Sequence, residues 1–337
     1  MPTTTADTDT AVLDLPESAR RALADGLRGR PDPADDIDAA LLALYPLFAA
    51  LPPAALGEIR DFGRYPDAPA ALLLRGLPTD AELPPTPVDG GPARGKTTFV
   101  SEGVLLGLTQ LIGEPAGYTT EKDGRLIHDI VPVDSGQRSQ TNQSSSVFLN
   151  FHNDITYDDC GRYNVTNPDF LILVCVKASP DGRGATFYAS ARAAVAALDP
   201  RDAAALREPD FRMNAPGTYC REHADGRDVW SSPVPVLSGP ADRPEIAASA
   251  NGVRPLNARA EAAWRALQEV CQRDDVAFGT LLRPGDALLI NNRKGLHARD
   301  PFHAAFDGRD RWLQRTYVRR SLWEQRHRST GVRRIHH

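Results

Sequence analysis

The segment FLNFHNDITYD, residues 148–158, places a histidine and an aspartate two positions apart, at His152 and Asp154, after alternating apolar residues. In an extended strand, residues i and i+2 point to the same face, so we expect these two side chains to project together. An imidazole and a carboxylate on one face supply two of the three ligands of the facial triad that holds non-haem Fe(II). Because an isolated H-x-D is more often a surface histidine beside an acid, this interpretation depends on a third ligand elsewhere.

A third ligand follows an apolar strand late in the chain. The segment PGDALLINNRKGLHARDPF, residues 284–302, predicts a turn, a buried strand and then His297. The next strand, within DGRDRWLQRTYVRR, carries Arg311 and Arg315, which lie four apart and therefore on one face. A 2-oxo dicarboxylate that chelates iron through its oxo-acid end still has a second carboxylate. The planar, permanently charged guanidinium is a better partner for that group than lysine.

The three metal-binding side chains leave two hypotheses open. Two histidines and an aspartate also accept other divalent ions, so a cupin-like β-barrel that binds a metal without oxygenase function is the alternative. Arg311 favours the oxygenase, because a protein without a dicarboxylate co-substrate has no need of such a clamp. Formation of succinate that depends on Fe(II) and 2-oxoglutarate distinguishes the two hypotheses.

The composition of the chain limits its class and its partners. The 337 residues are 41% hydrophobic and 25% charged, which is typical of a globular protein with a buried core. A net charge of −5 gives no reason to expect nucleic acid or an anionic membrane as partner. The apolar stretches are short, the N-terminus lacks the pattern of a signal peptide, and the four cysteines show no C-x-x-C spacing. These features predict a cytoplasmic protein without disulfide bonds.

The elements that must position the site begin with helices. The first third is rich in Ala and Leu at helical spacing, with Pro31 and Pro33 as separators. Gly113 and Pro115 are expected to end a later helix, which follows a Pro- and Gly-rich loop. We expect helices over 16–29, over 35–63 and from residue 100 to about 113, with a short buried strand over 70–78.

From about residue 125 the pattern changes to short apolar runs separated by turn residues, which is typical of a sandwich or barrel. Two helical stretches, 191–208 and 257–274, interrupt it. The predicted fold class is α+β with a mainly β core. The expected organisation is a disordered tail over 1–12, a single domain over 13–325 with a helical part to about 120 and a β-core over about 125–320, and a basic tail over 326–337.

Several blocks in this order resemble the clavaminate synthase-like branch of the Fe(II)/2-oxoglutarate-dependent oxygenases. The blocks are LLGLTQLIGEPAGY, H-N-D with NPDFLILVCVKA after it, GATF, and GDALLINNRKGLHARDPF…DGRDRWLQRTYV, and they span about 105–317. That branch includes the arginine and asparagine β-hydroxylases of peptide-antibiotic biosynthesis. The resemblance implies a distorted double-stranded β-helix, or cupin-like jelly roll, with flanking helices. It also implies Fe(II), with 2-oxoglutarate and O2 as co-substrates.

The resemblance implies a role for each matching residue. The iron ligands are His152, Asp154 and His297; Arg311 and Thr186 bind the 2-oxoglutarate carboxylate; Arg315 and Glu121 bind the substrate carboxylate and ammonium; and Asn251 and Ser146 line the substrate pocket. Ser146 is taken from the segment TNQSSS, residues 141–146, which falls where relatives line that pocket.

Two departures from the family pattern refine the expected reaction. Relatives generally have Glu where this chain has Asp154, which is still a competent ligand, and a carboxylate there favours oxygen transfer over halogenation. The lid AASANGVRPLN lacks the acids with which relatives meet a guanidinium, and an unpaired buried guanidinium is costly. We therefore expect hydroxylation, or desaturation after the same first step, at C3 or C4 of an amino acid with a polar uncharged or extended side chain. The substrate is either free or bound to a carrier protein.

Overall fold

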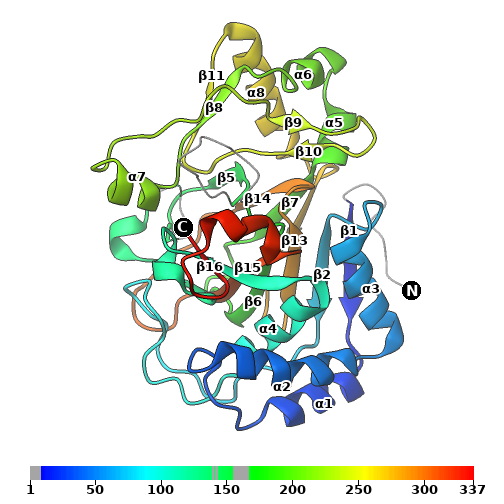
Figure 1. Ribbon diagram of the computed structural model, residues 1–337, viewed down its shortest axis with the longest axis vertical. Coiled ribbons are helices and arrows are strands. Elements are labelled where there is room, and N and C mark those ends of the chain that lie inside the picture. Colours follow the sequence, from blue (N-terminus) through cyan, green and yellow to red (C-terminus); the bar gives the residue numbers. More distant parts are fainter. Residues whose placement is uncertain (1–8, 139, 141–142, 155–166) are drawn as a thin grey trace.

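Two β-sheets face each other, and helices cover the outer side of each sheet in this computed structural model (Figure 1). The structure describes residues 9–138, 140, 143–154 and 167–337. Most of the predicted N-terminal tail, the start of the segment 141–146 and Cys160 lie outside the described residues. The architecture is mixed α and β, as the sequence predicted.

The larger sheet has eight strands drawn from both ends of the chain. Most neighbours are antiparallel, but the two outermost pairs, β1 with β2 and β16 with β3, are parallel. In spatial order the strands are β1 (Thr10–Asp14), β2 (Ala71–Arg75), β13 (Ala287–Asn291), β6 (Phe170–Lys177), β15 (Trp312–Arg319), β3 (Glu114–Tyr118) and β16 (Ile335–His336), with β4 (His128–Ile130) also paired to β15.

The smaller sheet has four antiparallel strands and carries the two histidines of interest. In spatial order they are β12 (Ala277–Thr280), β7 (Thr186–Ser190), β14 (Gly295–Arg299) and β5 (Leu149–His152). His152 therefore ends β5, and His297 lies in the middle of β14. The two histidines are paired across these neighbouring strands.

Strand β6 shows how the large sheet separates two cores. Phe170, Ile172 and Val174 pack in the core under the N-terminal helices, whereas Leu171 and Leu173 pack in the core that includes Tyr188 of the small sheet. Strands β2 and β13 divide their residues in the same way. Because successive residues of a strand face opposite sides, a continuous apolar run serves both cores.

Four helices cover the outer face of the large sheet, and proline residues separate two of them. The predicted helix over 35–63 is wrong in one respect, because Pro52 and Pro53 divide it into two helices. Proline lacks the N–H group that would continue the hydrogen-bond ladder, but it is tolerated in the first turn of the second helix. The helices are α1 (Glu17–Leu27), α2 (Ile37–Ala49), α3 (Pro53–Arg64) and α4 (Val100–Ile112).

The other helices lie beyond the small sheet or beside the pocket. Three of them pack in a third core against the outer face of the small sheet. The predicted helix over 191–208 is divided at Pro200, for the same reason as the helix above. The elements are α5 (Ala191–Ala197), α6 (Pro200–Ala205), α7 (Gly217–His223) and α8 (Ala258–Val270), with short strands β8 (Phe211–Met213), β9 (Leu237–Ser238), β10 (Glu245–Ile246) and β11 (Val253–Pro255).

Both ends of the described chain correct the sequence prediction. The tail was expected to run to residue 12, but β1 begins at Thr10 and pairs with β2. The basic tail over 326–337 was expected to be a solvated end, but its first three residues belong to the 3₁₀ helix η3 (Leu322–Arg328) and its end returns to the large sheet as β16. Two features hold it there: Arg334 forms ion pairs with Asp38 and Glu114, and His336 is buried.

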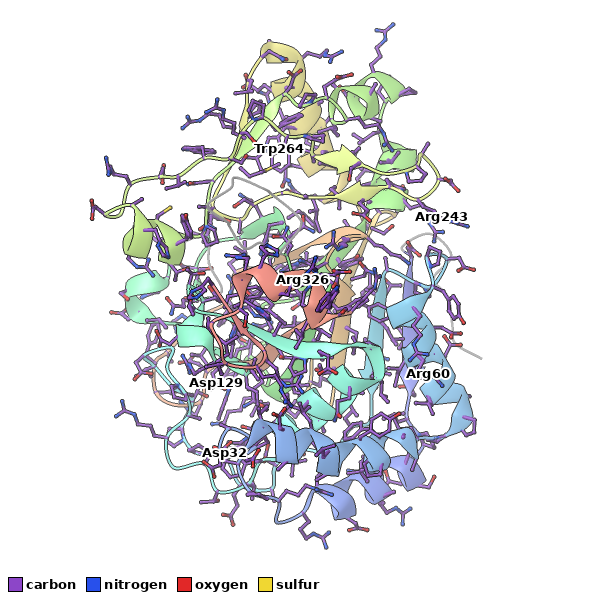
Figure 2. The ribbon with its side chains drawn as sticks, in the orientation of Figure 1. Asp32, Arg60, Asp129, Arg243, Trp264 and Arg326 are labelled. Carbon is purple, nitrogen blue, oxygen red and sulfur yellow. The ribbon has the colours of Figure 1, made fainter. Side chains whose placement is uncertain are left out.

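Strand β3 is a further element that the sequence did not predict, because its proline was taken only as the end of α4. Pro115 is compatible with the strand, because β16, the edge strand beyond β3, pairs only with Gly117 and Tyr118. No helix among the described residues is long and apolar enough to cross a membrane. Charged side chains such as those of Arg60 and Arg243 project from the surface (Figure 2).

Candidate active site

A cavity of about 540 Å³ opens between the two sheets. The small sheet supplies His152, His297 and Arg299, and the large sheet supplies Arg315. Arg311, the residue just before β15, lines the same cavity. Loops and the start of α7 complete its rim. Residues of every type expected at the site therefore converge on one cavity.

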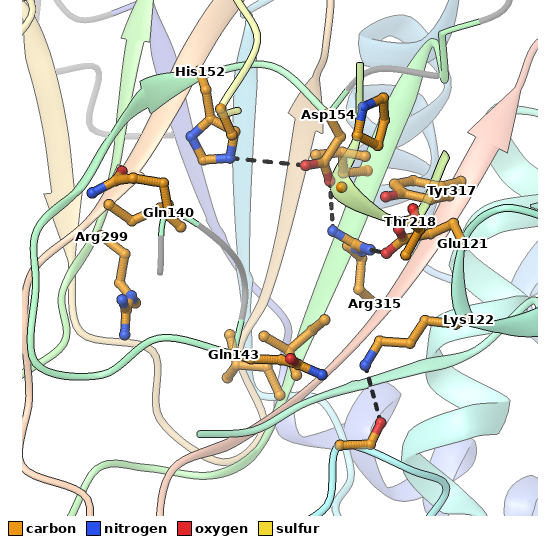
Figure 3. A pocket seen from close by; sticks show the side chains of 18 of the residues that line it. Glu121, Lys122, Gln140, Gln143, His152, Asp154, Thr218, Arg299, Arg315 and Tyr317 are labelled. Atoms are coloured by element: carbon orange, nitrogen blue, oxygen red, sulfur yellow. Dashed lines mark hydrogen bonds and ion pairs between the residues drawn. The ribbon is translucent and has the colours of Figure 1, made fainter. Parts of the chain in front are cut away.

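The two histidines and the aspartate come together in this cavity. Oδ1 of Asp154 lies 3.8 Å from Nε2 of His152 and 3.8 Å from Nε2 of His297 (Figure 3). The centres of the two imidazole rings are 4.2 Å apart. One ligand atom from each residue lies within 4.8 Å of the others, which is close enough for all three to bind one metal ion.

The H-N-D segment is fixed from the side opposite the cavity. Asn153, between the two candidate ligands, donates to the backbone carbonyls of Asn292 and Gly295 at 2.6 and 2.8 Å. The Asn292 side chain accepts from the backbone N–H of Asp154 at 3.1 Å and donates to its carbonyl at 2.7 Å. With Asn153 held outward, His152 and Asp154 project inward together, as strand alternation predicted.

The protonation states of the three side chains fit a metal ion. Burial lowers the pKa of His152, and burial together with His152 lowers the pKa of His297 to about 3, so both imidazoles are neutral near pH 7. Although burial alone would raise the pKa of Asp154, the charge of Arg315 beside it lowers that pKa. Nδ1 of His152 donates to the carbonyl of Asn150 at 2.6 Å, which leaves the lone pair of Nε2 directed into the cavity. The donor set therefore fits a divalent ion such as Fe(II).

Arg315 is held in place by groups on three sides. It donates from Nη1 to Oδ2 of Asp154 at 2.7 Å and from Nη2 to Oε1 of Glu121 at 3.0 Å (Figure 3). His128 donates from Nε2 to the carbonyl of Arg125, so its Nδ1 can accept from Arg315 Nη2 at 3.0 Å. One oxygen of Asp154 thus faces the imidazoles while the other is held by the guanidinium. His128 lies in a strand beside the site and supports Arg315.

Arg311 is a buried cation without a carboxylate partner among the described residues. Its Nη2 donates to Oγ1 of Thr186 at 3.2 Å, and burial lowers the pKa of Arg311 to about 10. A guanidinium out of water and without a counter-ion is costly, and an anion bound in the cavity would relieve that cost. The pair of Arg311 and Thr186 therefore forms a corner suited to a carboxylate.

Arg299 adds a second cation to this corner, and the sequence analysis missed it. It lies opposite Thr186 in the pairing of β14 with β7, and it donates to the carbonyl and hydroxyl oxygens of Ser144 at 2.8 and 2.7 Å. Burial and the charge of Arg311 lower the pKa of Arg299 to about 9. The signal was present in the sequence, since Arg299 follows His297 by two and therefore shares its strand face.

The remaining predicted pocket residues divide into those that line the cavity and one that does not. Glu121 and Asn251 line it. Ser146 is exposed outside the cavity, because the turn at 143–147 directs its hydroxyl to the carbonyl of Gln137 at 2.9 Å. Gln140 and Gln143 of the same region line the cavity instead.

Comparisons with known proteins agree with this geometry. The family model described as taurine catabolism dioxygenase TauD, TfdA family matches residues 71–317. An L-asparagine oxygenase from Streptomyces coelicolor is 34% identical over 319 residues, which cover 94% of this chain and 90% of that protein. An L-lysine 3-hydroxylase from Catenulispora acidiphila is 30% identical over 291 residues, which cover 85% of this chain and 77% of that protein.

A solved structure extends the similarity from sequence to fold. The crystal structure of an asparagine oxygenase in complex with Fe(II), 2S,3S-3-hydroxyasparagine and succinate matches this chain with a TM-score of 0.83 and 30% sequence identity. The match covers 96% of this chain and 98% of that chain. The likeness therefore extends over both sheets and their helices.

Proposed function

The chain belongs to the taurine catabolism dioxygenase TauD, TfdA family, and from this premise we propose that it hydroxylates an L-amino acid at C3 or C4. The family confirms the resemblance drawn from the sequence blocks: the protein is an Fe(II)- and 2-oxoglutarate-dependent oxygenase. Its relatives act on asparagine and lysine, so the substrate is a small amino acid or a derivative of one.

The fold and domain organisation form part of the proposal. We assign the two facing sheets to a distorted double-stranded β-helix and the described chain to a single domain. Support comes from the large sheet, which joins strands from the first hundred residues to strands from the last fifty. We also propose a reducing, cytoplasmic location, in keeping with the three described cysteines, all of which are free thiols.

We assign the metal to His152, Asp154 and His297. When bound, Fe(II) supplies the activation of O2 by oxidative decarboxylation of 2-oxoglutarate, with succinate and CO2 as co-products. Arg315 keeps the Asp154 carboxylate turned toward the imidazoles by holding its second oxygen. The asparagine contacts behind the H-N-D segment limit its movement, so the three donors keep a common orientation.

Two different carboxylates are assigned to two different arginines. Arg311, with Thr186 and Arg299 beside it, binds the far carboxylate of 2-oxoglutarate, because this corner has positive charge and no acid of its own among the described residues. Arg315 and Glu121 bind the carboxylate and the ammonium of the amino acid, since they present opposite charges 3.0 Å apart. Fixing both acids sets the position of the substrate C–H bond relative to the metal.

One observation carries the proposal. A three-donor cluster lines the same cavity as a buried guanidinium, that of Arg311, which has no carboxylate partner among the described residues. A cupin-like protein that only stores or binds a metal would need the first feature and would be destabilised by the second. The oxygenase reaction uses both, so the non-oxygenase alternative is not supported.

The test is incubation of the purified protein with Fe(II), 2-oxoglutarate, O2 and single amino acids. We expect one group of amino acids to raise succinate formation well above the rate without substrate and to gain 16 mass units. The Asp154→Ala variant serves as the negative control. Succinate formation that no amino acid increases, with no oxygenated product from any of them, would overturn the assignment to free amino acids. Carrier-bound amino acids would then be tested in the same assay.

A further inference from the structure

Lys122 is a cation in the cavity wall that the proposed reaction does not yet use. It follows Glu121 in the turn η1 (Lys122–Gly124), and both residues line the cavity. Its Nζ donates to the carbonyl of Gly90 at 3.0 Å (Figure 3). An ammonium group has three N–H donors, so two remain for a ligand after this contact.

The backbone around Lys122 adopts a costly conformation. Lys122, Asp123 and Gly124 have φ angles of 52°, 57° and 75°, in the left-handed region that disfavours residues with a side chain. Strand β16 supports this turn, because Ile335 packs against Gly124 and the backbone of His336 accepts from Thr119 at 2.8 Å. Strained residues held by their surroundings are concentrated at functional sites.

The charge of Lys122 is not balanced by a neighbouring acid. Within the described parts of the chain, no carboxylate lies at ion-pair distance from its Nζ. Of the two acids adjacent to it in sequence, Glu121 is bound to Arg315 and Asp123 is exposed. Burial and the charge of Arg315 lower the pKa of Lys122. A half-buried ammonium that faces a cavity favours a ligand that brings oxygen acceptors.

The other charged residues of the cavity rim add to the same field. Arg125, which is half-buried, also lines it, whereas Arg221 lines it at an exposed position. The rim acids Asp89 and Asp123 are exposed, so water screens their charge more strongly than the charges inside. Among the described residues, the cavity therefore offers a buried excess of positive charge around the substrate.

We propose that Lys122 determines substrate class: it selects amino acids whose side chain ends in a carbonyl oxygen, as a carboxamide, ureido or carboxylate group, and rejects ammonium and guanidinium ends. This inference rests on the proposed function and adds the chemistry of the side chain. It also groups this chain with the relative named for asparagine, whose side chain ends in a carboxamide, and separates it from the relative named for lysine.

The first experiment uses substrates that differ only in charge. Citrulline and arginine have nearly the same shape, but one ends in a neutral ureido group and the other in a guanidinium. Glutamine and glutamate form a second pair, and ornithine and lysine complete the cationic set. With the Fe(II)-loaded protein we expect kcat/KM for citrulline to exceed that for arginine by at least about tenfold, because like charges repel inside a partly desolvated cavity.

Two variants connect that preference to one side chain. Lys122→Met keeps the length and removes the charge, and Lys122→Glu reverses it; both keep a Cβ, so the strained backbone costs the same. We expect the citrulline-to-arginine ratio to fall about tenfold in the first variant and on the order of 100-fold in the second. Arg28→Glu, at the exposed residue that follows α1, makes the same change in net charge as Lys122→Glu at a position that does not line the cavity, and it should leave the ratio unchanged.

Binding must follow the same order as turnover. Calorimetry of the anaerobic protein with Fe(II) and 2-oxoglutarate measures the Kd of each amino acid without consuming it. We expect Lys122→Glu to tighten the binding of arginine and ornithine and to weaken that of glutamate.

The possible outcomes distinguish the two proposals. If cationic amino acids are hydroxylated best, or if the Lys122 variants leave the ratio unchanged, this inference is overturned and the hydroxylase function stands. If no amino acid of either class binds or is oxygenated, the assignment to free amino acids fails, and with it this inference.

Discussion

The two faces of strand β15 carry buried charges that are treated in opposite ways. On one face, Trp312 and Gln314 meet a cluster in which Lys96 binds Glu102 at 2.5 Å and Asp80 at 3.2 Å. On the other face, Arg315 lines the cavity, and Arg311 lies just before the strand. We call the first set closed, because each of its charged groups is paired with another group of the chain. We call the second set open, because its arginines face the cavity.

The open face is where ligands are needed. Among the described residues, Arg311 has no acid partner and Nε of Arg315 has no hydrogen-bond partner. The three side chains that we assign to the metal each direct one potential ligand atom toward a common point. Buried polar groups are normally satisfied, so several unsatisfied groups in one cavity mark a place that a bound molecule completes. The closed set holds β15 in position, and this position directs Arg315 of the open set into the cavity.

Removal of a metal-binding residue is the strongest way to test the open face. In His297→Ala we expect activity to fall by at least about 10³-fold, since the metal contributes several kcal/mol to the reaction. The free energy of unfolding should change little, because Nδ1 of His297 has no hydrogen bond to any of the described residues. Succinate formation and urea unfolding measure the two effects. A large loss of stability without loss of metal binding would contradict the comparison.

The closed face should respond in the reverse way. Lys96→Met leaves Asp80 and Glu102 without their counter-ion, and breaking a buried ion pair from one side costs about 3–5 kcal/mol. We expect this loss in the free energy of unfolding, measured in urea. The kcat/KM of the folded variant should stay within about threefold of the parent, since Lys96 does not line the cavity. The exposed Arg94→Met is the control, and a stable but inactive Lys96 variant would refute this distinction.

Arg311 combines a functional gain with a stability cost. Arg311→Met should raise the KM for 2-oxoglutarate by about 100-fold, because hydrogen bonds to charged groups contribute about 1.5–3 kcal/mol. The same change removes an unpaired buried cation, so the protein without ligands should become more stable by about 1 kcal/mol. Steady-state kinetics and urea unfolding test both parts. Arg309→Met, at an exposed position two residues away, should do neither. Destabilisation by Arg311→Met would mean that the chain itself satisfies this guanidinium.

A smaller effect is expected where β15 joins the closed cluster. Gln314 donates to Glu102 at 2.8 Å, and Gln314→Leu removes this bond while keeping much of the volume. We expect a loss of about 1–2 kcal/mol in the free energy of unfolding. Because the next residue is Arg315, the KM of the amino acid reports whether the strand has also shifted. If the change in that KM, expressed as a free energy, exceeded the loss in the free energy of unfolding, the two faces would not be independent.

His336 tests how far an unsatisfied buried group indicates function. It is buried against Tyr118, and neither ring nitrogen has a hydrogen-bond partner in the part of the chain that the structure describes. It does not line the cavity. Burial lowers its pKa from 6.5 to about 4. Between these values the unfolded chain binds a proton that the folded chain does not, so stability should fall as the pH falls from about 6.5 to about 4. His336→Phe should show a smaller fall in urea midpoint between pH 7 and pH 5. An equal fall in both proteins would remove His336 as a cause.

Local rules predicted the parts of the site that are local. His152 and Asp154 share a face because the strand period is two, and that rule needs no tertiary information. The same rule applied to His297 would have identified Arg299. The assembly of His152, Asp154 and His297 into one site required the pairing of β5 with β14 and the packing of two sheets, and only the family resemblance predicted that assembly.

Other features depend on contacts that no local pattern encodes. Lys96 lies in a loop without periodicity, and its partners are on α4 and β15. The C-terminal residues appeared to be a solvated basic end, but their arginine side chains find acids on α2 and β3. Ser146 was placed in the pocket by its position in a motif, whereas the turn around it decides its direction.

The most direct test of the metal site is a crystal structure of the protein with Fe(II) and 2-oxoglutarate, grown and frozen without oxygen. We expect one anomalous iron peak within bonding distance of Nε2 of His152, Oδ1 of Asp154 and Nε2 of His297, and the far carboxylate of 2-oxoglutarate against Arg311. Iron bound elsewhere, or 2-oxoglutarate bound with Arg311 still unpaired, would contradict this account.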